Sequence, residues 1–307
     1  MLAVTPLNLA QLSGRPLGPI AILVGLGVAW GATIPLTKVA VSTGHAPLGL
    51  IFWQLAITAV ILGVVLLAAR VSVPFDRRAI VFYLGVGLLG TVAPNSFSYV
   101  AAAELPAGVM GIVLAGVPMW SLLLALGLRL ESFDGVRCVG LLAGGIAVVL
   151  IAGPDTALPD AGKAVFVLVA VAATVCYGAE GHFIVAFSPP RLNPLAALFG
   201  ASIVAVTFVG PAAWLLGDWV DLSASWEIAE WALVWSTLAH VVAYSGFIWL
   251  VGIAGAVFSS QIAYVVTMTA VFLSAWFLDE RYSAWVWVAL VFMIAGIALV
   301  RPRASSA

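Results

Sequence analysis

The chain has 307 residues, of which 64% are hydrophobic and 8% are charged, and its mean hydropathy is +1.19. A soluble domain is about one quarter charged, so this composition excludes a water-facing shell, and lipid must be the solvent for most of the surface. The formal net charge is −1, and the sequence has no basic run of the kind that indicates a nucleic-acid partner.

Apolar runs long enough to cross a bilayer recur along the chain, since a transmembrane helix needs about 20 apolar residues. Reading these runs against Pro, Gly and charged breaks predicts ten helices. They are expected at roughly residues 19–41, 47–69, 79–102, 106–128, 134–152, 163–187, 193–216, 226–251, 256–277 and 283–300. The connections are too short for a soluble domain, and no alternating strand pattern is present, so an all-α membrane protein is expected.

Basic residues gather on one side of the predicted bundle. Ten spans return the chain to the side on which it starts, and nine arginines then lie on that side: Arg15, Arg70, Arg77, Arg78, Arg129, Arg137, Arg191, Arg301 and Arg303. The other side has Lys38, Lys163 and Arg281. Because cytoplasmic loops carry the excess of Lys and Arg, both termini are predicted to be cytoplasmic. The chain is expected to be a multi-pass protein of a bacterial inner membrane.

Four short stretches of the first half recur in order in the second half, about 150 residues later. They pair Val28–Lys38 with the stretch from Val175, Phe97–Tyr99 with Phe247–Trp249, Pro118–Glu131 with Thr267–Glu280, and Gly144–Ala147 with Ala295–Ala298. Two five-helix repeats are therefore expected, at residues 1–152 and 153–307. Since five is odd, the second repeat must be inverted relative to the first. Many secondary transporters have this arrangement, with a substrate site between the halves.

These motifs also carry a family resemblance. The Trp30-Gly-Ala stretch with Lys38 downstream, the Pro118–Glu131 pair and the glycine-rich fifth segment resemble the EamA family of the drug/metabolite transporter superfamily, over residues 22–300 in two copies. The resemblance implies ten helices around a central cavity, cytoplasmic termini and secondary transport, usually export of small metabolites. Within the family, the chain is most similar to aromatic amino acid exporters of the YddG type.

Two positions depart from the family pattern. Many members carry an arginine early in the second segment, where this chain has Trp53 and Gln54, and the second repeat has Thr267 where proline is common. The first departure speaks against recognition of a substrate carboxylate through that arginine. Gln54 takes its place as a candidate cavity residue.

Ionisable side chains inside a span are costly, so each is a candidate for the substrate cavity. Glu180 either couples protons or binds an amine, or it is a neutral or paired carboxylate near the headgroups. Lys38 lies near the end of its helix, where a structural use at the interface competes with binding. His240, with Tyr244 one turn on and on the same face, is either satisfied by a neighbouring helix or lines the cavity.

Two predicted helices carry polar side chains on one face. They are Thr91, Asn95, Ser98 and Tyr99 in the third segment, and Gln261, Tyr264 and Thr267 in the ninth. Lipid would not tolerate such a face, so each must meet another helix or a water-filled cavity. Interhelical bonding and cavity lining both remain open.

Equivalent aromatic and helix-breaking residues complete the candidate set. Trp30 and Tyr177 hold matching positions in the two repeats, where they either pack or line the cavity. Pro35, Pro94 and Pro118 interrupt helices and are candidate hinges, because each removes a backbone hydrogen bond.

The leading functional hypothesis is export of small metabolites, especially aromatic amino acids, by alternating access through the central cavity. Another metabolite or a drug-like cation is the alternative within the superfamily. The sequence has no G-x-x-x-x-G-K-[ST] motif, which disfavours direct ATP drive, and no H-E-x-x-H motif or catalytic carboxylate pair, so an enzyme is not expected. A channel is a third possibility, although no ring of charged residues is displayed.

No metal or other cofactor is expected, because Cys138 and Cys176 fall in apolar runs without metal-ligand spacing. The expected partners are a small-molecule substrate and the lipid bilayer. The oligomeric state is left open.

Overall fold

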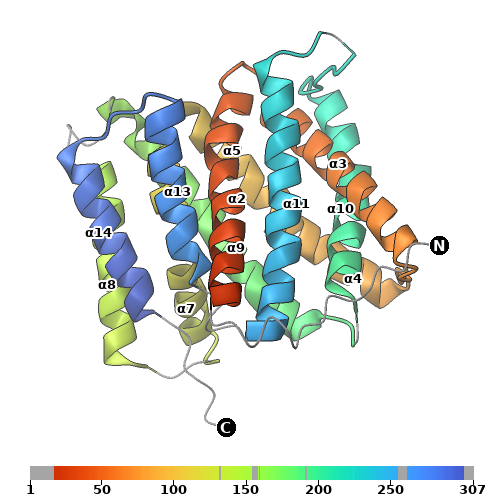
Figure 1. The fold of residues 1–307 in the computed structure, drawn as a ribbon, viewed down its shortest axis with the longest axis horizontal. Coiled ribbons are helices and arrows are strands. Elements are labelled where there is room, and N and C mark those ends of the chain that lie inside the picture. Colours follow the sequence, from red (N-terminus) through yellow and green to blue (C-terminus); the bar gives the residue numbers. More distant parts are fainter. Residues whose placement is uncertain are drawn as a thin grey trace.

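The computed structural model describes residues 17–130, 133–153, 158, 160–190, 192–223, 225–254 and 261–300. Over these residues every regular element is a helix (Figure 1). The first half consists of α2 (Leu17–Val41), α3 (Pro47–Ala68), α4 (Arg77–Gly87), the π-helical turn η1 (Leu88–Val92), α5 (Ala93–Glu104), α6 (Ala107–Leu114), α7 (Val117–Gly127) and α8 (Gly135–Ala152). The second half consists of the short 3₁₀ turn η2 (Ala161–Lys163), α9 (Ala164–Phe187), α10 (Pro194–Leu215), α11 (Ile228–Ala254), α13 (Ile262–Phe277) and α14 (Ala284–Leu299).

These helices match the ten predicted segments, with two internal interruptions. The third segment is a continuous run in which η1 separates α4 from α5, and Pro94 follows that turn. The fourth segment breaks after Leu114, and Pro118 stands in the first turn of α7. Proline is tolerated in a first turn because the N–H groups of that turn have no acceptor within the helix, so no hydrogen bond is lost.

Most helix ends lie within two residues of their predicted positions, and the end of the eighth segment moves further. The eighth segment was expected to end at residue 251, but α11 continues to Ala254. The following residues, 255–260, lie outside the described part of the chain, as do Arg15, Glu131, Arg191, Arg301 and Arg303.

The helices have the length and composition of membrane spans. Among the residues described, seven helical stretches are long and apolar enough to cross a bilayer, and α13 and α14 are shorter apolar helices. The 27-residue α11 is also predominantly apolar. Large apolar side chains are exposed along the outer faces, for example Val64, Leu142 and Val185, as lipid contact requires.

The two halves run in opposite directions. Lys38, in the last turn of α2, donates from Nζ to the carbonyl oxygen of Ala103 near the end of α5, at 3.0 Å. Lys163, directly before α9, forms an ion pair of 3.0 Å with Glu104. The first helix of one half therefore ends where the first helix of the other begins (Figure 1). We call this end of the bundle the lysine end.

The opposite end carries arginines and is called the arginine end. The side chains in the described residues are Arg70, Arg77, Arg78, Arg129 and Arg137, at the ends of α3 and α7 and the starts of α4 and α8. Three helices that begin there have a side-chain cap: Asp76 for α4, Asp134 for α8 and Asn193 for α10. Each cap accepts two backbone N–H groups that the helix itself cannot bond.

Exposed tryptophans mark the lysine end. They lie at the end of α10, the start of α11, the end of α13 and the start of α14, or in the loops between: Trp214, Trp219, Trp226, Trp231, Trp276 and Trp285. Tryptophan favours the boundary between hydrocarbon and water, so the position of these indole side chains fits a membrane interface at the lysine end.

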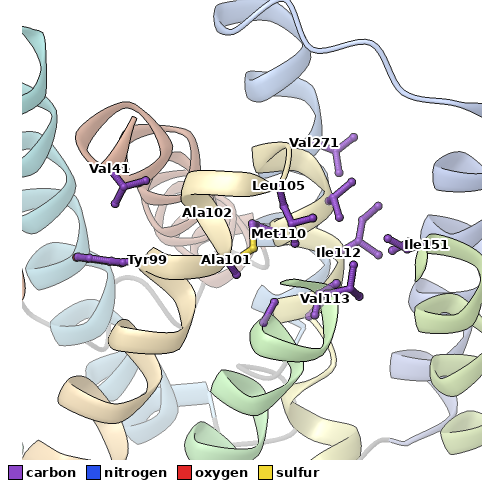
Figure 2. Close-up of a cluster of buried hydrophobic side chains, with 14 of the residues drawn as sticks. Val41, Tyr99, Ala101, Ala102, Leu105, Met110, Ile112, Val113, Ile151 and Val271 are labelled. Atoms are coloured by element: carbon purple, nitrogen blue, oxygen red, sulfur yellow. The ribbon is translucent and has the colours of Figure 1, made fainter. Parts of the chain in front are cut away.

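Helix packing follows the repeat. The first helix of each half packs on the third and fourth helices of the other: α2 on α11 and α13, and α9 on α5, α6 and α7. The second helices, α3 and α10, pack on each other, as do the fifth helices, α8 and α14. The largest apolar core surrounds α6, where Leu105, Met110 and Ile112 are buried (Figure 2).

Glycines permit these close crossings at equivalent places. A Cβ atom on Gly31 would lie 2.6 Å from Cβ of Thr269 in α13, and one on Gly178 would lie 2.9 Å from the backbone nitrogen of Ser121 in α7. Gly31 and Gly178 follow the equivalent aromatic residues Trp30 and Tyr177. The repeat read from the sequence is thus present in the packing of individual residues.

Candidate functional site

A hydrogen-bonded group of four side chains joins the two halves in the middle of the bundle; we call it the amide cluster. Tyr177 of α9 donates from its hydroxyl to Oδ1 of Asn95 in α5, at 2.9 Å. Asn95 donates from Nδ2 to Oε1 of Gln54 in α3 at 2.9 Å, and Tyr99 donates to the same oxygen at 2.6 Å. Asn95 and Tyr99 are buried. The polar face predicted for the third segment therefore meets both α3 and the first helix of the other half.

An aromatic cluster lies around Trp30, on the other side of the repeat. The ring of Trp30 contacts His240, Tyr244 and Phe247 of α11 edge-on, with centroids 6.0, 6.1 and 5.7 Å away. His240 and Tyr244 stack on each other at 6.0 Å, with 18° between their planes. Such geometries are favourable for aromatic pairs. The structure thus brings together three predicted residues, and Phe247 joins them.

Trp30 and Tyr177 make equivalent contacts of different chemistry. Each comes from the first helix of its half and reaches the third helix of the other half. Tyr177 meets hydrogen-bonding side chains there, whereas Trp30 meets rings. The symmetric frame therefore holds an asymmetric set of side chains.

The Glu180 carboxylate stands between these clusters. It lies one helical turn beyond Tyr177 on the same face of α9, and it interacts electrostatically with the hydroxyl groups of both Tyr177 and Tyr244. Opposite it is Gly90 in η1, where a Cβ atom would collide with the carboxylate. π-helical turns inside α-helices are frequent at functional sites. Thr91, next to Gly90, is half-buried in the same turn.

His182 does not share this site with Glu180. Its Nε2 donates to the carbonyl oxygen of Ser121 in α7, at 2.8 Å. The two side chains, two residues apart, therefore leave α9 in different directions, as expected from helical geometry.

Lys38 lies away from the two clusters, in a group of charged residues at the lysine end. A hollow of about 270 Å³ there is lined by Lys38, Glu104, Leu105, Pro106, Leu158, Asp160, Lys163, Glu280 and Arg281. The Lys38 ammonium bonds the carbonyl of Ala103 near the C-terminus of α5, where a helix dipole favours a cation. This contact supports the structural use of Lys38.

Glu280 caps a helix of the other half at this end. Its carboxylate accepts the backbone N–H groups of Ala107 at 2.6 Å and Gly108 at 3.1 Å, which open α6. It also accepts the hydroxyl of Tyr282 at 2.7 Å. Burial raises the pKa of the Tyr282 phenol, and the bond to Glu280 adds to that rise.

The remaining predicted residues have varied surroundings. Ser98 is buried, and Pro35 is buried inside α2. Thr267 donates back to the carbonyl oxygen of Ala263 in its own helix, at 2.8 Å, so its hydroxyl is already used. Gln261 directly precedes α13, Tyr264 lies in its first turn, and both are half-buried.

Sequence reasoning missed three groups of interactions. Glu280 is the last residue of a recognised repeat motif, but nothing in the sequence shows that it caps α6 or bonds Tyr282. Ser236 of α11 lies 3.4 Å from the hydroxyl of Thr37 in α2, and His45 pairs with Glu230 at 2.7 Å. Residues of these types are common in loops and helices, so the sequence does not indicate either pair. Each pair becomes recognisable only when the positions of the two halves are known.

Among the residues that the structure describes, no group of three or more His, Cys, Asp or Glu side chains could hold a metal ion.

Comparisons with known proteins agree with the repeat and the fold. The model of the EamA-like transporter family matches the chain twice, at residues 17–153 and 165–301. A crystal structure of another protein resembles this chain with a TM-score of 0.63 and 18% sequence identity, over 91% of this chain and 96% of the other. At that identity the likeness concerns the fold alone. No functionally curated protein matches the chain in sequence.

Proposed function

Because the chain belongs to the EamA-like transporter family of the drug/metabolite transporter superfamily, we propose that it exports small metabolites by alternating access. Amino acids, and aromatic ones above all, are the substrates we favour. The observation that carries this proposal is that the amide cluster and the aromatic cluster each join the two inverted halves, and that Glu180 interacts with a tyrosine of each cluster. A site placed there can be exposed to either side when the halves move.

The chemistry of the clusters supports an aromatic solute. Trp30, His240 and Tyr244 offer ring faces and edges on which another ring can pack, and stiff rings lose little conformational entropy on binding. Gln54 and Asn95 supply amide groups for the polar part of a solute. Together these side chains form the two kinds of surface that an aromatic amino acid requires.

The contacts at the lysine end support a gating role for that end. Glu280 holds α6, and the Lys163–Glu104 pair ties the start of α9 to the end of α5, so both contacts join the halves. Opening the bundle at this end requires these bonds to part. The arginine end is then the cytoplasmic one by the positive-inside rule, and export runs from the arginine end to the lysine end.

Reconstituted protein tests the proposal. Purified full-length protein in liposomes should accelerate the flux of labelled Phe or Trp down a concentration gradient, relative to protein-free liposomes. Thr serves as a non-aromatic comparison. If none of these solutes moves faster than in protein-free liposomes while the protein is folded and inserted, the substrate assignment is wrong.

A further inference from the structure

Glu180 has no counter-ion in the described part of the chain. No hydrogen bond or ion pair of its carboxylate is formed there, and its electrostatic neighbours are the neutral phenols of Tyr177 and Tyr244. The Lys and Arg side chains of the described residues belong to the two ends of the bundle. An ionised carboxylate inside a span is costly unless a positive charge balances it.

The Glu180 carboxylate packs against the π-helical turn η1. Gly90 faces it, and any larger residue there would occupy the position of the carboxylate. Pro94, four residues on, has no N–H, so the i+4 hydrogen bond to the Gly90 carbonyl is absent where η1 has π-helical i+5 spacing. The carboxylate accepts hydrogen bonds only, and the oxygen atoms of the two phenols can also accept. They suit a group that only donates hydrogen bonds and carries positive charge, such as a protonated amine.

Aromatic rings lie near the same carboxylate. Tyr244, which interacts with Glu180, also packs on Trp30 and stacks on His240. Ring faces attract cations, and the same rings can pack on an aromatic part of the ligand. A carboxylate on the ligand has no Lys or Arg among these residues to pair with, and only neutral amide and hydroxyl donors are near.

We infer that Glu180 binds the protonated amino group of the transported solute, so that an amine is the required feature and a carboxylate is dispensable. The inference rests on the proposed function for the location of the site. It adds a specificity rule: an aromatic amine binds, with or without a carboxylate, and the matching acid without the amine does not.

Binding by the purified full-length protein tests this rule separately from transport. The probes are tryptamine, tryptophan and indole-3-propionate, which share the indole and differ in amine and carboxylate. Tryptamine and tryptophan should raise the melting temperature of the wild type, and indole-3-propionate should not. Glu180→Gln should weaken tryptamine binding about ten- to a hundredfold, the loss expected for a charge-assisted hydrogen bond.

Two further variants separate the site from folding. Glu180→Gln should unfold at the wild-type temperature or higher without ligand, because the carboxylate has no partner to lose among the residues that the structure describes. Gly90→Ala should also weaken tryptamine binding, because its methyl group collides with the carboxylate. Gly181→Ala adds a methyl group where no atom lies within 4 Å and should bind as the wild type does.

The outcomes distinguish the two proposals. Tryptamine binding that is unchanged in Glu180→Gln, or indole-3-propionate binding equal to that of tryptamine, overturns the amine site even if liposomes transport Trp. Glu180-dependent tryptamine binding without any flux of Phe or Trp supports the amine site and rejects the proposed amino acid substrates.

Discussion

The Glu280 carboxylate links the loop between α13 and α14 to the first turn of α6, so replacing Glu280 with alanine removes three hydrogen bonds, two of which join distant parts of the chain. The bonds to Ala107, Gly108 and Tyr282 are 2.6, 3.1 and 2.7 Å long. A hydrogen bond to a charged group contributes about 1.5–3 kcal/mol in water-soluble proteins, whereas bonds inside membrane proteins average about 0.6 kcal/mol. Glu280 is half-buried at the lysine end, between these two environments. A loss of about 2–4 kcal/mol in the free energy of unfolding is expected.

Unfolding of the purified protein in detergent or nanodiscs measures this loss. Glu280→Gln keeps one acceptor oxygen but loses the negative charge that the N-terminus of α6 favours. It should therefore lower the free energy of unfolding about half as much as Glu280→Ala does. Glu227→Ala is the matched control, because Glu227 is an exposed glutamate at the same end. A loss below about 0.5 kcal/mol for Glu280→Ala, within the range of an ordinary surface substitution, would refute the reasoning.

Three further predictions follow from the packing and the hydrogen bonds. Gly140→Ala should destabilise the protein by about 1–3 kcal/mol, as overpacking does, because a Cβ atom there lies 2.9 Å from the Gly296 carbonyl oxygen of α14; Gly145→Ala, with nothing within 4 Å, should be neutral in the same unfolding assay. Equal effects of the two would contradict the close α8–α14 crossing. Asn95→Ala and Tyr99→Ala should lower liposome transport more than Gly145→Ala at equal protein density, and a loss of stability with unchanged transport would assign the amide cluster to interhelical bonding alone. Tyr282→Phe should be less stable than the wild type at neutral pH. Because burial raises the pKa of this phenol in the folded state, its contribution is constant below the ordinary tyrosine pKa of about 10 and falls as pH rises above it. The difference between the two proteins should therefore shrink between pH 9 and about 11, and a constant difference would show that the phenol is not buried.

Much of the frame could be predicted from the sequence. Hydropathy located the ten helical segments because every backbone group in a membrane must be bonded within its own helix, which makes spans long and continuous. The repeat was readable at Trp30 and Tyr177 because each is followed by a glycine at a helix crossing, and the crossing tolerates little else. At these two crossings the helix backbones lie so close that only glycine fits, so the glycine itself indicates the crossing in the sequence.

The interactions between helices could not be predicted in the same way. The face from Asn95 to Tyr99 was recognisable as polar, but its acceptor, Gln54, lies in α3, about 40 residues away. The periodicity of polar residues predicts that this helix face needs a polar partner. It does not identify the helix or the residue that provides it. Gly140 shows the same limit: glycines four residues apart, Gly140 and Gly144, are a pattern that permits close helix packing, but only the structure identifies α14 as the neighbour.

The equivalent positions of Trp30 and Tyr177 explain how a symmetric frame can hold a solute in one orientation. Inversion alone would present the same side chains twice, and a solute would then bind equally well in two opposite orientations. Here the third helix of the first half supplies Asn95 and Tyr99, while that of the second half supplies His240 and Tyr244. Glu180 is a third asymmetric element, because the matching residue of α2, three positions after Trp30, is Thr33. At the proposed site, a solute with a ring at one end and a charged amine at the other would therefore meet different partners on the two sides, and only one orientation would satisfy both.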